Sequence, residues 1–183
     1  MPTTPRRWVL RQRTSEAHSA VDAAIGAFGD LTSYTAYLQS IAAFRQPLER
    51  QLADFAFPPG LEGWRPTAVG AAISADLADL GVAPASRAVG DLALRGDGLF
   101  GALYVLKGSA LGARLLFERA KTLGLSSEFG ARHLALLSGS IEGWRGFLDR
   151  LEAAEPFDID QAVETSVAVF ARARAAFEGS LHG

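Results

Sequence analysis

Residues 98–120, GLFGALYVLKGSALGARLLFERA, are the longest apolar stretch in this chain of 183 residues, and they decide its fold class. Their apolar side chains recur at the three- and four-residue spacing of an α-helix, and Gly124 marks the end of that helix. The same spacing continues through nearly the whole sequence, and no segment alternates with the two-residue period of a β-strand. We therefore predict an all-α fold in which long helices pack around one core.

The helical pattern is interrupted by glycine and proline at regular intervals, which sets the expected boundaries. The expected helices cover residues 8–27, 31–56, 67–80, 97–123, 126–135, 139–153 and 158–179. A chain of this length with 49% hydrophobic residues can bury one sizeable core. We predict a single domain over residues 1–183, with residues 1–7 and 180–183 disordered.

Composition excludes several classes of protein. The chain has no cysteine, which rules out disulfides, thiolate catalysis and cysteine-ligated metal centres. A formal net charge of −2 without a basic stripe argues against a nucleic-acid surface. The N-terminus lacks the apolar segment of a secretory signal, and Lys107, Arg114 and several glycines interrupt the longest apolar stretch. We expect a soluble cytoplasmic protein that binds neither membrane nor nucleic acid.

The glycines inside residues 98–120 need an explanation, because each interior helix glycine costs roughly 0.5–1 kcal/mol relative to alanine. Gly101, Gly108, Ser109 and Gly112 fall on one side of the expected helix, which therefore carries almost no side-chain bulk. Either another helix or a flat ligand could approach the backbone there. The sequence leaves both occupants open.

His18, one of three histidines, lies at the edge of an apolar stripe, with Val21 and Ile25 on its face. It could be a half-buried histidine that a nearby carboxylate or carbonyl satisfies. It could instead be a ligand, although a single histidine cannot build a closed zinc site. One histidine can hold haem iron axially, since the porphyrin supplies four nitrogens.

Four segments, taken in order along the chain, resemble the bacterial haem oxygenases, and most closely the compact biliverdin-producing type of Pseudomonas and Neisseria. They are LRQRTSEAHSAVD at 10–22, ADLADLG at 75–81, GALYVLKGSALGARLLFERA at 101–120, and SSEFGARHLALLSGSIEGWRGFLDRLE at 126–152. The resemblance implies a haem-oxygenase-like helical bundle with haem sandwiched between a proximal helix and a kinked distal helix. It also implies oxidative opening of haem to biliverdin, with release of CO and ferrous iron.

The resemblance assigns roles to residues of this sequence. His18 is implied as the proximal iron ligand, with its second ring nitrogen bonded to an acceptor that could be Glu16 or Asp22. Gly108, Ser109 and Gly112 are implied as the distal wall over the haem. Haem is then both substrate and cofactor, used with O₂ and with electrons from an external reductase or ferredoxin.

Further residues are candidates for holding the haem itself. Arg11 matches a propionate partner, Thr14 lies on the His18 face, Tyr104 matches an aromatic position near a propionate, and Arg119 replaces a lysine of the family. Phe147 could pack on the haem or belong to the core.

The sequence also departs from the family pattern, because Lys107 stands where relatives often carry glutamate. This departure changes little if Lys107 points outward. His133 is expected to be structural or exposed, and His182 lies close to the end of the chain. The alternative to an enzyme is a non-catalytic haem-binding, storage or sensor protein. We expect a ferredoxin or an NAD(P)H-dependent reductase as redox partner, and a monomer or weak dimer.

Overall fold

The structure is a computed structural model that describes residues 4–85, 90–139 and 141–179. Within these ranges the chain folds into helices, and the β-pairing there is a single isolated bridge between Ser126 and Gly130. The predicted all-α fold is confirmed. The helices are α1 (Arg6–Arg13), α2 (Ser15–Ile25), α3 (Leu31–Ala53), α4 (Gly70–Asp79), α5 (Gly98–Thr122), α6 (Arg132–Ser138), α7 (Ile141–Ala153) and α8 (Ile159–Gly179).

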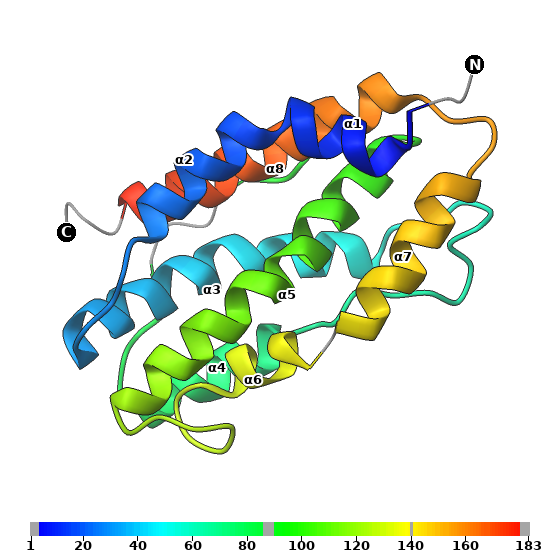
Figure 1. The fold of residues 1–183 in the computed structure, drawn as a ribbon. Coiled ribbons are helices and arrows are strands. Elements are labelled where there is room, and N and C mark those ends of the chain that lie inside the picture. The colour runs from blue at the N-terminus through cyan, green and yellow to red at the C-terminus, as the bar shows by residue number, and fades with distance from the viewer. Residues whose placement is uncertain (1–3, 86–89, 140, 180–183) are drawn as a thin grey trace.

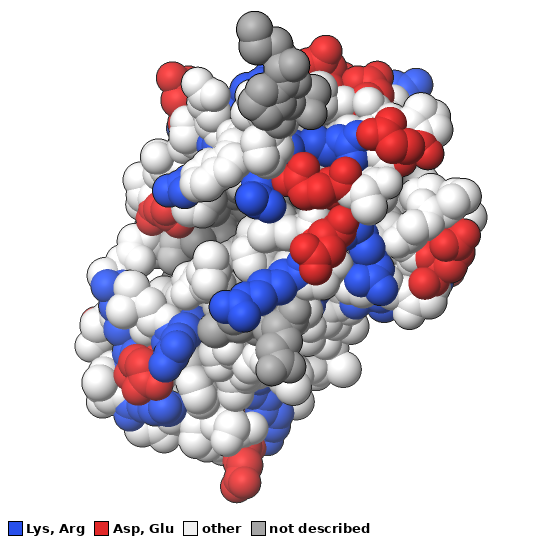
Figure 2. Space-filling view, turned by 45° about the vertical axis from the view of Figure 1, so that its right-hand side comes forward, with Lys and Arg blue, Asp and Glu red and all other residues white. Residues whose placement is uncertain are grey.

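Helix α5 runs through the middle of the molecule, and the other helices surround it (Figure 1). The first two helices lie side by side with α8 along one edge, while α3 runs behind α5. Helices α4 and α6 contact each other at the opposite edge, and α7 flanks α5. Figure 2 shows Lys and Arg interspersed with Asp and Glu on the face that it presents.

Two buried apolar clusters form the core around α5. One contains Phe100, Leu103 and Phe147 and lies among α5, α7 and α8. The other contains Tyr34 and Leu134 and joins α3, α4 and α6. By length and composition alone, α5 could also cross a membrane, but more than half of its apolar window is buried inside the protein. Its hydrophobicity is therefore that of a central core helix.

The first expected helix, over 8–27, is in fact two helices that meet at Thr14 (φ −109°, ψ 3°). The Thr14 hydroxyl donates to the Leu10 carbonyl at 2.7 Å, and the Ser15 hydroxyl donates to the Gln12 carbonyl at 2.9 Å. Such side-chain bonds to the preceding turn bend or end a helix. The break gives α2, which carries His18, a direction separate from that of α1.

The N-terminal boundary also differs from the sequence expectation. Arg6 and Arg7 begin α1, and their backbone N–H groups donate to the Glu152 carboxylate at 2.9 and 3.1 Å. Arg6 also donates to the Leu151 carbonyl. These bonds tie the start of the chain to α7. Residues 1–3 and 180–183, including His182, lie outside the described residues.

The helix expected over 126–135 begins later, at Arg132. Gly130, with φ of +71°, turns the chain before it, and carboxylates of α4 fix the turn. Asp79 accepts from the Gly130 N–H at 2.8 Å, while Asp76 accepts from the Arg132 and His133 N–H groups at 3.0 and 3.1 Å. Asp76 thus caps the first turn of α6 from a distant segment, which apolar spacing cannot reveal.

The glycines of α5 serve two purposes along its length. At its start, a Cβ on Gly98 or Gly101 would collide with α8, where the nearest atoms belong to Thr165 and Ala162. Further along, a Cβ on Gly108 would meet only Trp144, at 3.9 Å, and one on Gly112 would meet nothing within 4 Å. The two alternatives from the sequence, a helix or a flat ligand, therefore apply to different parts of α5. Helix α8 packs on the glycines of the first half, and open space adjoins those of the second half.

Candidate functional site

A cavity of about 1040 Å³ lies between α2 and α5. Ligand pockets typically measure about 300–1000 Å³, so the space can hold a large organic molecule. Residues of α1, α3, α6, α7 and α8 also line it. The apolar lining includes Val21, Ile25, Ile41, Phe44, Val105, Leu106, Leu111, Leu115, Leu137, Trp144, Leu148, Phe170 and Phe177.

His18 lies on the α2 wall of this cavity. Its Nδ1 lies 2.9 Å from the Asp22 carboxylate, one turn along the helix, and its ring meets Phe170 edge-on at 5.5 Å. Among the described residues Nε2 has no hydrogen-bond partner, and 58% of the His18 side chain is exposed. An Nδ1–H directed at this carboxylate leaves the lone pair that a metal requires on Nε2. Of the two acceptors weighed from sequence, Asp22 is the one that lies against Nδ1.

The opposite wall is the second half of α5. Gly108 and Gly112 line the cavity and leave room where other residues would place side chains. Ser109 also lines it, and its hydroxyl donates to the Leu106 carbonyl at 2.7 Å. A flat molecule on this wall would touch backbone atoms and small side chains, in the cavity that His18 also lines.

Cationic and hydroxyl groups line the same cavity. Arg11 and Arg119, both expected from sequence, belong to the lining together with Tyr104. Burial raises the pKa of Tyr104 and the Arg11 charge partly offsets this, so the phenol keeps its proton at neutral pH. Guanidinium groups and a phenol O–H form strong hydrogen bonds with carboxylates.

Two other expected residues are placed differently. Thr14 lines the cavity, but it is only 2% exposed and its hydroxyl is bonded to Leu10. Phe147 is fully buried, does not line the cavity, and stacks on Trp144 with ring centres 6.0 Å apart. Phe147 therefore belongs to the core, and Trp144 and Leu148 take the cavity positions on α7.

Several lining residues were not anticipated from the sequence. Trp8, Leu111 and Leu115 line the cavity although each is about half exposed or more. Leu111 and Leu115 are one turn apart in the apolar helix, so their spacing could have indicated a shared exposed face. Arg45 of α3 also lines the cavity. The sequence did not indicate this, because a single basic residue in an amphipathic helix is expected at the surface.

Lys107 points neither into the cavity nor to solvent. It is 5% exposed, its Nζ lies 3.4 Å from the Thr67 hydroxyl, and it sits 5.6 Å from the centre of the Trp64 ring. Gly143 leaves space for the ammonium group, since a Cβ there would come within 2.6 Å of Nζ. The departure at residue 107 is thus accommodated in the core beside the cavity.

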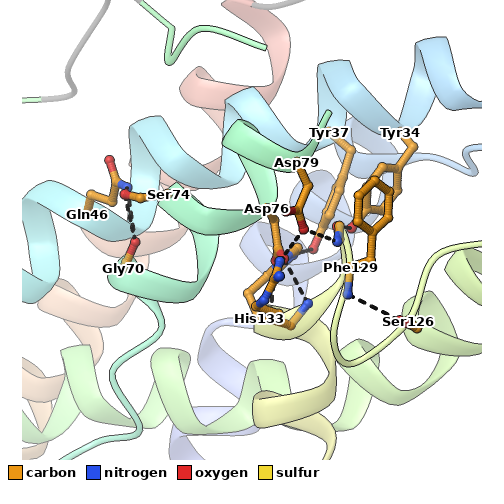
Figure 3. A network of polar contacts seen from close by, with 12 residues as sticks. Tyr34, Tyr37, Gln46, Gly70, Ser74, Asp76, Asp79, Ser126, Phe129 and His133 are labelled. Atoms are coloured by element: carbon orange, nitrogen blue, oxygen red, sulfur yellow. Dashed lines mark hydrogen bonds and ion pairs between the residues drawn. The ribbon is translucent and has the colours of Figure 1, made fainter. Parts of the chain in front are cut away.

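His133 is a structural residue rather than a ligand. It is fully buried, its Nδ1 lies 2.8 Å from the Asp76 carboxylate, and its Nε2 lies 3.4 Å from the Tyr37 hydroxyl (Figure 3). Arg132 joins the same network through ion pairs with Asp76 and Asp79. The network connects α3, α4 and α6 behind the cavity.

Haem is a flat macrocycle with an iron at its centre and carboxylates on one edge, and the cavity residues fit these features. The lining is mostly apolar, it includes His18 together with Gly108 and Gly112, and arginine and tyrosine groups are available for carboxylates. A lone histidine suffices for haem iron.

Comparisons with known proteins agree with this reading. No protein-family model matches the sequence. The chain is 32% identical over 164 residues to heme oxygenase PigA of Pseudomonas aeruginosa, a match that covers 84% of this chain and 83% of the relative. The chain belongs to the haem oxygenase family. The predicted family and the predicted haem-degrading enzyme are confirmed, and a non-catalytic haem protein is not favoured.

The fold of this haem oxygenase family member is also seen in a solved structure. The NO- and CO-bound heme oxygenase of Neisseria meningitidis superposes with a TM-score of 0.76. The alignment covers 97% of this chain and 92% of the other, at 22% sequence identity. At that identity the similarity establishes the shared all-α architecture.

Proposed function

We propose that this protein opens haem oxidatively to biliverdin, with release of CO and ferrous iron, and that Nε2 of His18 binds the iron. O₂ is the oxidant, and the electrons come from a separate ferredoxin or NAD(P)H-dependent reductase. The observation that carries the proposal is the position of His18, whose Nδ1 lies beside the Asp22 carboxylate and which lines the same cavity as Gly108 and Gly112.

His18 and Asp22 form the proximal half of the site. In this proposal the Asp22 carboxylate, 2.9 Å from Nδ1, accepts a hydrogen bond from the Nδ1–H and holds the imidazole in one tautomer and one orientation. It also makes Nε2 a stronger donor toward iron. Phe170, edge-on to the imidazole, limits its rotation.

Gly108, Ser109 and Gly112 form the distal half. Bound haem supplies both the iron at which O₂ is reduced and the ring carbon that is oxidised. The bare backbone at Gly108 and Gly112 would let the ring approach α5, and the apolar side chains of the lining would limit access of water to it. No acid–base side chain replaces the glycines at this wall, which leaves backbone groups and small polar groups to contact the oxidant.

Arg11, Tyr104 and Arg119 orient the substrate. Their charges and O–H group are suited to the haem propionates, and Thr14 contributes to the wall by packing rather than through its bonded hydroxyl. We further propose that the protein works as a monomer or weak dimer in the cytoplasm.

The test is a spectroscopic titration with haemin followed by reduction in air. The purified protein is expected to give the Soret band of histidine-ligated haem, and ascorbate or a ferredoxin system is expected to convert it to a bilin spectrum. The matched variant His18→Ala is expected to lose the histidine-ligated spectrum. Bound haem that survives reduction in air would contradict ring opening, and would favour a storage or sensor role.

A further inference from the structure

Arg45 is the largest fully buried side chain in the described part of the chain, and it lines the cavity from α3. It is 2% exposed. Burying a guanidinium costs several kcal/mol unless good hydrogen bonds compensate. Its partners therefore indicate what the buried charge accomplishes.

Three segments meet at the Arg45 guanidinium. Its Nε and one terminal nitrogen contact the Glu49 carboxylate at 3.0 and 2.9 Å, and this second nitrogen also donates to the Thr67 carbonyl at 3.2 Å. The other terminal nitrogen donates to the Leu106 carbonyl in α5 at 3.5 Å. One planar group thus connects α3, the segment before α4, and α5.

Glu49 anchors this arrangement at its other end. Its carboxylate accepts from the backbone N–H of Val69 at 3.0 Å and of Gly70 at 2.8 Å, where α4 begins. Burial lowers the pKa of Arg45, and the Glu49 charge opposes that effect. The pair is held rigidly because each partner is also bonded to backbone.

The Leu106 carbonyl is a notable acceptor, because it lies two residues before Gly108 and receives a second bond from the Ser109 hydroxyl at 2.7 Å. Both donors act within the stretch of α5, from Tyr104 to Gly112, that contributes to the cavity lining. Glycines on either side of this point leave α5 locally easy to bend. Hydrogen bonds to the Leu106 carbonyl can therefore hold the cavity-lining part of α5 in one position.

We propose that Arg45 is a positioning residue for haem opening: through the Leu106 carbonyl it sets how close Gly108 and Ser109 stand to the haem. This inference rests on haem occupying the cavity as proposed above. A lysine at residue 45 would keep the charge but lacks the planar fork that reaches Glu49, Thr67 and Leu106 together. Arginine is thus required for its geometry.

The experiment compares Arg45→Met, Arg45→Lys and Glu49→Gln with the parent, each loaded with haemin and then reduced under CO. The C–O stretching band reports the surroundings of the ligand on the distal side. We expect a single band in the parent, a broadened or split band in Arg45→Met, and smaller changes in the other two. Ring opening in Arg45→Met is expected to slow about 10- to 100-fold, because small displacements at a reaction site cost that much. Haemin affinity changes far less.

The matched control is Gln46→Ala. Gln46 also joins α3 to α4, and its side-chain amide donates to the Gly70 carbonyl at 3.2 Å and to the Ser74 hydroxyl at 2.9 Å, both in α4 (Figure 3). We expect it to lower thermal stability while leaving the C–O band and the rate of ring opening unchanged.

Two outcomes would overturn the inference: a parental C–O band and rate in Arg45→Met, or equal changes in Gln46→Ala. If Arg45→Met does not fold, Arg45→Lys is judged by the same criteria. If the parent binds no haemin, the proposed function and this inference are both contradicted. If the parent binds and opens haem and the variants at residue 45 behave like it, only the inference is contradicted.

Discussion

The backbone of Gly101 in α5 presses against the backbone of Ala162 in α8, with no side chain between them. A Cβ on Gly101 would lie 2.9 Å from the Ala162 carbonyl carbon and closer still to its oxygen. The Ser166 hydroxyl locks the contact by donating to the carbonyl of Gly101 at 3.0 Å. The position therefore belongs to the packing of the fold.

We predict that Gly101→Ala lowers the free energy of unfolding by about 1–3 kcal/mol or more, as overpacking a core does. Urea unfolding followed by circular dichroism measures it. Gly112→Ala is the control, because nothing lies near its Cβ, and it should gain about 0.5–1 kcal/mol from helix propensity. Equal stability losses at both positions would contradict the assignment of two different faces.

Gly112→Leu tests the cavity side of the same helix. Since its side chain would project into the space across from His18, we expect haemin affinity to fall by on the order of tenfold or more. The unfolding free energy of the haem-free protein should not fall. Fluorescence quenching by haemin gives the affinity, and a variant that binds haemin like the parent would show that the ligand lies elsewhere.

Asp22→Ala tests the partner of the iron ligand. Loss of a hydrogen-bonded partner behind a ligating histidine typically costs about 10–100-fold in metal affinity or activity. We expect a loss of that size in haemin affinity, with a shifted Soret band. Glu16→Ala is the control, because the structure gives the bond to Asp22, and it should resemble the parent.

The network behind the cavity predicts loss of stability in acid. Burial alone would raise the pKa of Asp76, but hydrogen bonds from His133 and from the Arg132 N–H outweigh it, and the pKa lies below its ordinary 3.8. Burial lowers the pKa of His133 below 6.5, and Asp76 only partly offsets this. Both groups bind protons more tightly when unfolded, so the free energy of unfolding falls as pH falls.

The decline should begin near pH 6.5, where the unfolded histidine gains its proton, and should continue below pH 3.8 as Asp76 does. Denaturant unfolding at a series of pH values measures it. In His133→Gln the upper part of the decline should disappear, although the protein is less stable throughout. A free energy that stays constant from pH 7 to pH 5 in the parent would contradict the role of His133.

Most of the fold could be predicted from the local spacing of apolar residues, because each helix shows this spacing within its own segment. What it could not predict depends on hydrogen bonds. The break at Thr14 arises from its hydroxyl bonding to Leu10, and the late start of α6 arises from Asp76, which lies more than fifty residues away in the chain. Neither interaction changes the apolar pattern.

The site was predictable to the extent that residues share a helix face or match the family pattern. His18, Arg11 and Gly112 fall on the cavity as expected. The burial of Arg45 and the core position of Phe147 could not be predicted. Both depend on packing against residues that are distant in the sequence.

The division of α5 has a consequence for how this protein can diverge. Variation at its first half is limited by whether the chain folds, since that half is pressed against α8. Variation at the cavity-lining positions of its second half is limited by which molecule the cavity accepts, since a Cβ on Gly112 would meet nothing within 4 Å. Descendants of this sequence can therefore acquire a different ligand by changing a few residues near one end of a single helix, while the scaffold that presents them is inherited intact.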